Sequence, residues 1–278
     1  MLYEKIDLYE YFNIERPEGA KGYLTLYVHQ PLKEYSLNRT RPAMLVIPGG
    51  AYSFLADREG EPIALRFFDN DYHAFLLEYS VKPVKYPAQL LEGCMAIAYI
   101  RENAEELHVN KDMIGAIGFS AGGHLTSMLA TIPDEKEIKE ILGDRVNYCR
   151  PNAVILSYPV ITCGEKAHKG SFINLCGEDN NKLWERLSTE TRVDENTCPA
   201  FIWGTVGDVG VPLENGMGFA SACRNAGVPF EYHLYEIGPH GLSLANEEVN
   251  SPNPQVATWL KLALGWLAQH GFKFTDKN

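Results

Sequence analysis

Gly118-Phe119-Ser120-Ala121-Gly122 lies between an apolar run, residues 113–117, and an apolar segment typical of a helix, residues 123–130. Strand, tight turn and helix in this order place a serine at the apex of a G-x-S-x-G turn. A serine hydroxyl is a weak nucleophile, so it must project from a sharp turn to where a base can reach it. The glycines on either side let neighbouring backbone pass close to the turn. The pattern predicts a nucleophile at Ser120, and a structural glycine turn is the alternative.

Short apolar runs alternate with helical segments along most of the chain. Runs that are apolar throughout are typical of strands buried on both faces, and this alternation predicts a mostly parallel sheet covered by helices on both faces. We expect strands at residues 23–29, 43–47, 72–79, 113–117, 153–157, 200–205 and 230–235. We expect helices at residues 61–70, 86–107, 123–130, 213–226 and 254–270.

The segments outside this alternation carry weaker signals. Residues 1–20 are mixed and polar, and residues 31–42 are expected to form a polar connection. Residues 158–198 are rich in polar groups, glycine and cysteine and show no strong period, so we expect an irregular insertion or lid over the site. No internal repeat is visible, and the sequence predicts a single α/β domain over residues 1–278.

Composition limits the class of partner. The 278 residues are 45% hydrophobic and 22% charged, as in soluble globular proteins, and their formal net charge is −11. This charge argues against nucleic acid or an anionic membrane as a partner. No run approaches the roughly 18 apolar residues of a membrane span, and no basic stretch precedes an apolar one at the start.

Cysteine usage indicates the compartment. The six cysteines include no C-x-x-C pair, and without a secretion signal we expect reduced thiols and a cytoplasmic protein. A disulfide between Cys163 and Cys176 is the alternative.

A serine nucleophile needs a base, which in the chain order serine, acid, histidine follows the last strands. Three histidines lie there. His233 falls within a strand pattern and His270 lies near the end of a helix, whereas His240 lies in the loop Gly238-Pro239-His240-Gly241. We expect His240 to be the base, and a solvated loop histidine is the alternative.

The remaining parts of such a site are a carboxylate and donors for an oxyanion. Asp208 is the only acid in the loop after residues 200–205 and is expected to orient His240, with a plain loop acid as the alternative. Backbone N–H groups of Gly50, Ala51 and Ala121 are the expected oxyanion donors, because one pair follows a buried strand and the third follows Ser120. A simple turn is the alternative for the glycine pair.

As a set, these loops resemble bacterial α/β-hydrolase esterases of the acetyl-xylan-esterase and carbohydrate-esterase-like type. The similarity spans residues 44–244 in the order of the family. The matching pieces are Ile47-Pro48-Gly49-Gly50-Ala51-Tyr52, Asp57-Arg58-Glu59-Gly60, Tyr86-Pro87, Gly118-Phe119-Ser120-Ala121-Gly122-Gly123-His124-Leu125, Val211-Pro212-Leu213-Glu214-Asn215 and Gly238-Pro239-His240-Gly241-Leu242.

The resemblance implies an α/β-hydrolase fold with Ser120 as nucleophile, Asp208 as acid and His240 as base, and oxyanion donors near Gly50, Ala51 and Ala121. Where the family tends to have a histidine before Thr205, a second aspartate before Asp208 and a third glycine in the donor loop, this chain has Gly204, Gly207 and Ala51.

Three further features carry two interpretations each. Tyr52 and His124 are candidate substrate-binding residues, and core packing is the alternative for both. The run Asp57-Arg58-Glu59 could orient the donor loop through an Arg–carboxylate pair or be a solvated charge run.

The resemblance further implies a serine carboxylic-ester hydrolase for short acyl esters, with acetylated sugars or small oligosaccharides as substrates and no metal or cofactor. The sequence is compatible with a homo-oligomer. A small peptidase or lactonase on the same scaffold, and a non-catalytic hydrolase-like ligand receptor, are the alternative functions.

Overall fold

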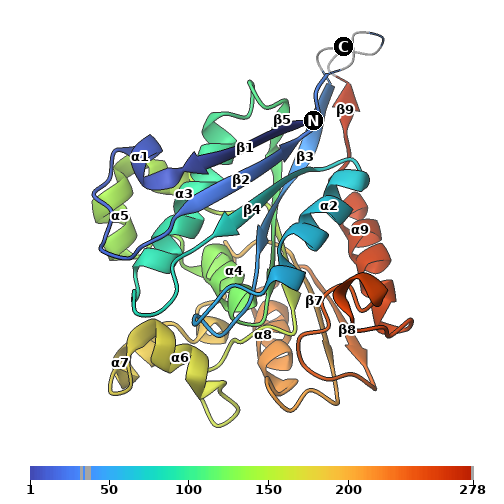
Figure 1. Ribbon diagram of the computed structural model, residues 1–278. Helices are drawn as coiled ribbons and strands as arrows, with labels where there is room; N and C mark the ends of the chain where they lie inside the picture. Colours follow the sequence, from blue (N-terminus) through green and yellow to red (C-terminus); the bar gives the residue numbers. More distant parts are fainter. Residues whose placement is uncertain (32–33, 35–38, 277–278) are drawn as a thin grey trace.

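A computed structural model describes residues 1–31, 34 and 39–276. Its centre is a sheet with the strand order β1-β2-β4-β3-β5-β6-β7-β8 (Figure 1). β1 and β2 pair antiparallel at one edge, β2 pairs antiparallel with β4, and all pairs from β4 to β8 are parallel. The strands are β1 (Leu2–Asp7), β2 (Tyr23–Val28), β3 (Arg39–Ile47), β4 (His73–Glu78), β5 (Val109–Phe119), β6 (Ala153–Ser157), β7 (Ala200–Thr205), β8 (Phe230–Tyr235) and the short β9 (Thr275–Asp276), which pairs with the start of β3.

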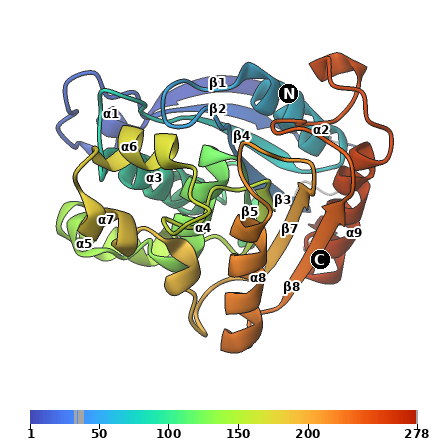
Figure 2. The same cartoon turned by 90° about the horizontal axis from the view of Figure 1, so that it is seen from below.

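Helices cover both faces of the sheet, which confirms the predicted α/β-hydrolase architecture. α2 and α9 pack on one face and α3 and α4 on the other (Figures 1 and 2). The α-helices are α1 (Leu8–Phe12), α2 (Glu61–Asp69), α3 (Ala88–Glu102), α4 (Ala121–Thr131), α5 (Lys136–Leu142), α6 (Lys169–Cys176), α7 (Asn181–Arg186), α8 (Glu214–Ala226) and α9 (Trp259–Gln269). Short 3₁₀ helices are η1 (Asp57–Glu59), η2 (Gly143–Tyr148), η3 (Thr189–Thr191), η4 (Glu247–Val249) and η5 (Val256–Thr258).

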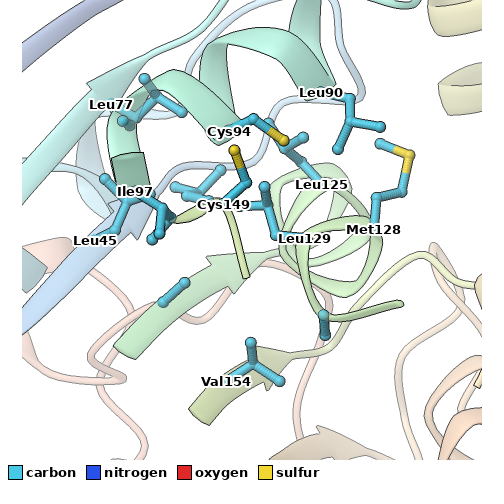
Figure 3. Packing of buried hydrophobic residues seen from close by; sticks show 14 of the residues in the cluster. Leu45, Leu77, Leu90, Cys94, Ile97, Leu125, Met128, Leu129, Cys149 and Val154 are labelled. Atoms are coloured by element: carbon cyan, nitrogen blue, oxygen red, sulfur yellow. The ribbon is translucent and has the colours of Figure 1, made fainter. Parts of the chain in front are cut away.

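The central strands are apolar throughout because successive side chains enter different cores. In β3, Leu45 and Ile47 pack toward α3 and α4, whereas Met44 and Val46 pack toward α2 and α9. Figure 3 shows the first of these cores, where side chains of α3 and α4 interdigitate above the strands. Continuous burial on both faces fixes the register of the parallel strands and therefore where their carboxyl ends lie.

Several regions differ from the sequence prediction. Residues 1–20 contain β1 and α1, whose Leu8, Tyr9 and Phe12 are buried, and this helix is too short to show a period. Residues 158–198 contain α6, α7 and η3 rather than irregular chain alone, and α5 was not predicted. The helix expected at residues 86–107 is shorter and spans Ala88–Glu102. Half of the connection expected at residues 31–42 lies outside the described residues, and residues 39–42 belong to β3 rather than to a connection.

Two expectations about the environment can be compared with the structure. All six cysteines are free thiols, so the alternative disulfide between Cys163 and Cys176 is not formed. Among the helices of the described residues, none combines the length and the apolar character needed to cross a bilayer.

Candidate active site

Ser120 lies at the apex of the turn from β5 to α4, with backbone angles φ 52° and ψ −116°. This conformation is strained for a residue with a side chain. The flanking glycines permit it, because a Cβ at Gly118 would lie 2.2 Å from the carbonyl oxygen of Gly122, and one at Gly122 would lie 2.2 Å from that of Ile47. The local sequence thus holds the hydroxyl at the end of β5, against the end of β3.

His240 and Asp208 come from the loops after β8 and β7 and meet Ser120 at the same edge of the sheet. Nε2 of His240 lies 2.8 Å from Oγ of Ser120, and Nδ1 lies 2.6 Å from Oδ2 of Asp208. A carboxylate only accepts, so Nδ1–H donates to Asp208 and Nε2 is left to accept the serine proton. The structure therefore joins the three predicted residues in one hydrogen-bonded relay.

Asp208 is held in place by its own loop. Its Oδ1 accepts the backbone N–H groups of Gly210 and Val211, each at 2.9 Å, and its side chain is only 2% exposed. The side chain of His240 is 28% exposed, so the relay runs from a buried carboxylate to a histidine that solvent can reach. Two backbone donors on the carboxylate fix which oxygen faces His240.

The predicted oxyanion donors lie in the β3–α2 loop (residues 48–60) and at the start of α4. Gly50, Ala51 and Tyr52 all have positive φ, of 123°, 54° and 55°. Ala51 therefore adopts the left-handed backbone that glycine favours, as the departure from the family pattern required. Within the described residues, the backbone N–H groups of Gly50, Ala51 and Ala121 have no acceptor in the protein, and Gly49 faces Ser120 closely enough that a Cβ there would lie 3.0 Å from the Ser120 Cβ.

Glu59 is hydrogen-bonded to the β3–α2 loop, and its partners could not be identified from the sequence. Its carboxylate is buried and accepts the Gly49 N–H and the Tyr158 hydroxyl, both at 2.8 Å. Burial raises the pKa of Glu59, and these hydrogen bonds act in the opposite direction. Gly49 N–H is thereby engaged, which leaves the donors of Gly50 and Ala51 for a ligand.

Tyr158 connects this carboxylate to the loop of the base. Its ring packs edge-on against the imidazole of His240 at 5.1 Å between centroids, and its hydroxyl accepts the Ser243 N–H at 2.9 Å. Arg58 adds a second link, since its Nε donates to the carbonyl oxygen of Gly241 at 2.8 Å. Asp57 and Arg58 are exposed, whereas Glu59 is buried, and the contacts of Arg58 and Glu59 tie the donor loop to the base loop.

Tyr52 and His124 do not line an open pocket, contrary to the expectation that they bind substrate. Their side chains are 0% and 1% exposed, and the Tyr52 hydroxyl lies 2.9 Å from Nδ1 of His124. Nε2 of His124 lies 2.8 Å from the carbonyl oxygen of Leu187, and burial lowers the pKa of His124 to about 4. The neutral ring accepts from Tyr52 and donates to Leu187, so the pair joins the β3–α2 loop to the segment after β6.

Residues 158–198 lie against the same loop (Figure 2). The side-chain amide of Asn174, in α6, donates to the carbonyl oxygen of Ala51 at 2.8 Å. His168 caps the start of α6, where its Nδ1 accepts the Ser171 N–H at 3.3 Å. Burial lowers the pKa of His168.

Known proteins share the sequence pattern and the fold of this chain. The model of the BD-FAE family matches residues 32–222. The chain is 36% identical to endo-1,4-beta-xylanase B of Butyrivibrio fibrisolvens over 85% of its own length and 37% of that protein. It is 31% identical to an acetylxylan esterase of Xylanibacter ruminicola, over 73% of this chain and 42% of that one. The chain thus spans about two fifths of the length of these curated relatives.

Two solved structures match almost the whole chain. An acetyl ester-xyloside bifunctional hydrolase from Caldicellulosiruptor lactoaceticus is 35% identical, with a TM-score of 0.82 over 97% of both chains. The carboxylesterase Cest-2923 from Lactobacillus plantarum is 27% identical, with a TM-score of 0.82 over 98% of this chain and 99% of that one.

Proposed function

Because this chain belongs to the BD-FAE family, we propose that it is a serine esterase that removes short acyl groups, foremost acetyl groups from sugars or small oligosaccharides. The observation that carries the proposal is the relay from Asp208 through His240 to Ser120, at 2.6 and 2.8 Å. This relay supports nucleophilic catalysis of acyl transfer.

In the proposed reaction, Ser120 Oγ attacks the ester carbonyl while Nε2 of His240 takes the hydroxyl proton. The imidazolium that forms is stabilised by the Asp208 carboxylate, and it returns the proton to the leaving alcohol as the C–O bond breaks. The acyl group is then esterified to Ser120. A water molecule repeats the sequence, with His240 again accepting a proton, and releases the acid and free serine.

The negative charge that develops on the carbonyl oxygen needs donors that are already in place. We assign this role to the backbone N–H groups of Gly50, Ala51 and Ala121, whose lack of protein acceptors within the described residues supports the assignment. Each such donor typically lowers the barrier by about 3–4 kcal/mol. This chemistry uses only groups of the chain itself.

Two observations support the substrate class and the setting. The acetylxylan esterase and the acetyl ester-xyloside hydrolase among the matching proteins favour an acetylated sugar as the substrate. The six free thiols favour a reducing compartment such as the cytoplasm.

The test is hydrolysis of p-nitrophenyl acetate, butyrate and octanoate, together with labelling by a fluorophosphonate. We expect acetate to be the fastest substrate, and the Ser120→Ala and His240→Ala variants to lose about 10⁴-fold or more in kcat. His270→Ala, at an exposed histidine after α9, is the matched control and should retain wild-type rates. A wild-type protein that neither labels nor hydrolyses any ester would overturn the proposal, and turnover of lactones or peptides alone would replace it with the corresponding alternative.

A further inference from the structure

The turn Gly50-Ala51-Tyr52-Ser53 carries two of the proposed oxyanion donors in a strained backbone. The Ser53 N–H donates to the Gly50 carbonyl oxygen at 2.8 Å, which closes a four-residue β-turn. Its two central residues, Ala51 and Tyr52, have φ of 54° and 55°, as in a type I′ turn. Glycine, asparagine and aspartate dominate these positions, and alanine and tyrosine are strained there. The conformation therefore needs support from outside the turn.

A rotation of the central peptide would relieve part of this strain. When the peptide between the two central residues turns over, a type I′ turn becomes a type II′ turn, in which only the first central residue has a positive φ. Tyr52 would then adopt a negative φ. Because the atoms of a peptide share a plane, the same rotation reverses both the Ala51 carbonyl and the Tyr52 N–H. A carbonyl oxygen would then replace an N–H group next in sequence to the proposed donor of Ala51, and it would oppose a developing negative charge.

Asn174 of α6 holds this peptide in its observed orientation. Its side-chain amide donates to the Ala51 carbonyl oxygen at 2.8 Å, and among the described residues it is the only donor to that oxygen. Lys85 in turn fixes the end of α6, because its Nζ donates to the carbonyl oxygens of Ile173 and Asn174, each at 2.8 Å. The side chain that restrains the turn is thus restrained itself, and it comes from a segment 123 positions away along the chain.

We infer that Asn174 is a positioning residue of the esterase, which keeps the peptide between Ala51 and Tyr52 turned so that the oxyanion donors can act. The inference rests on the proposed function and extends it to α6, an element that contributes no residue to the relay. Asn174 acts through the backbone of the turn and needs no contact with the substrate. Its loss weakens binding of the transition state but leaves binding of the ground state, whose carbonyl oxygen carries little charge, almost unchanged.

Kinetics and a transition-state analogue test this role. Since small displacements of reacting groups cost up to about 100-fold in rate, we expect Asn174→Ala to lower kcat for p-nitrophenyl acetate about 10- to 100-fold with KM nearly unchanged. Ser120 adds to a trifluoromethyl ketone to give a tetrahedral hemiketal whose oxygen carries negative charge, so the Ki of this inhibitor should rise by a similar factor. Rates are counted per active site that a fluorophosphonate labels to completion, so unfolded protein does not contribute.

Two further variants sharpen the comparison. Asn174→Asp keeps the shape of the side chain but replaces the donor by an acceptor, so it should act in the same direction as Asn174→Ala. Asn70→Ala is the matched control, because the Asn70 side-chain amide also donates to a backbone carbonyl oxygen at 2.8 Å, that of Arg66, at the end of α2 remote from the β3–α2 loop. This control should keep the wild-type kcat and Ki.

The two readouts distinguish failure of this inference from failure of the proposed function. An active enzyme whose Asn174→Ala form keeps the wild-type kcat, or loses kcat without a rise in Ki, overturns the inference alone. A wild-type protein that hydrolyses no ester but binds the ketone more tightly than Asn174→Ala does supports the inference and overturns the esterase. A wild-type protein that neither hydrolyses esters nor binds the ketone overturns both.

Discussion

The carboxylate of Glu59 has two donors and almost no contact with solvent, although it lies in a run of three charged residues. Its bonds to Gly49 and Tyr158 link the loop of the oxyanion donors to the loop of the base. We therefore regard Glu59 as a positioning residue, which acts through other groups and does not touch the substrate.

Replacing Glu59 by Gln keeps the volume but puts a donor where one of two acceptor oxygens stood. A hydrogen bond to a charged group contributes about 1.5–3 kcal/mol, and small displacements of a reacting group cost up to about 100-fold in rate. We expect kcat for p-nitrophenyl acetate to fall about 10- to 100-fold with KM nearly unchanged. Steady-state kinetics below the unfolding temperature of the variant provide the measurement.

Two further variants separate positioning from general damage. Tyr158→Phe keeps the ring against His240 but removes the hydroxyl, so it should lower kcat in the same direction as Glu59→Gln. Glu106→Gln, at an exposed carboxylate, should leave both constants at wild-type values. A Glu59→Gln enzyme with wild-type kcat would contradict the assigned role.

At this scale the sequence predicts the three residues of the relay better than the residues that support them. Ser120, Asp208 and His240 each follow a recognisable strand, and the structure brings them together. The contact between Glu59 and Tyr158 joins residues 99 positions apart and leaves no local pattern. For Tyr52 the sequence leaves substrate binding and core packing as alternatives, and the structure, in which its ring is buried, agrees with core packing.

Between elements, α4 closely approaches the end of β3. A Cβ at Gly122 would lie 2.2 Å from the carbonyl oxygen of Ile47 and 2.4 Å from that of Pro48. Both obstacles are backbone atoms, so neither can rotate away. This contact sets how far the β3–α2 loop lies from Ser120.

Gly122→Ala should therefore separate the two elements and destabilise the protein. Overpacking of this kind costs about 1–3 kcal/mol and occasionally more, and we expect a loss of at least about 2 kcal/mol in the free energy of unfolding, with reduced ester hydrolysis. Gly265→Ala, in α9, is the matched control because a Cβ there meets nothing within 4 Å. It should stabilise the helix by about 0.5–1 kcal/mol. Denaturant unfolding of both variants makes the comparison, and equal stabilities would contradict the packing argument.

The difference between local sequence pattern and tertiary contact also explains which elements the sequence predicts. β6, β7 and β8 are predicted to the residue. β6 and β7 are buried and apolar throughout, whereas β8 is a half-buried edge strand in which apolar and polar residues alternate. α1 and α7 have only five and six residues; α1 buries Leu8, Tyr9 and Phe12 against other segments, whereas no residue of α7 is fully buried. Tertiary contacts rather than local propensity therefore specify the short helices.

Across the whole molecule, Glu92 of α3 ties the N-terminal segment to the sheet. Its carboxylate accepts the hydroxyl of Tyr9 at 3.0 Å and the backbone N–H of Ser80 at 2.6 Å, which joins α1 to the chain after β4. The side chain is fully buried, and this burial raises the pKa of Glu92 to about 7. The Glu92 carboxyl therefore changes its protonation state near neutral pH.

The pH dependence of stability should therefore change when Glu92 is replaced by Gln. The folded state holds a proton on Glu92 more tightly than the unfolded chain, so this contribution to stability is complete below pH 4.5 and is lost as the pH rises through about 7. At about 1.4 kcal/mol per pKa unit, the loss amounts to at most about 3 kcal/mol. Buried histidines act in the opposite direction, but they are common to both proteins and cancel in the difference. We expect the free energy of unfolding of Glu92→Gln minus that of the wild type to increase between pH 5 and 8 in urea titrations. A difference that stays constant over this range would mean that Glu92 remains ionised in the folded protein and that its hydrogen bonds outweigh the cost of burial.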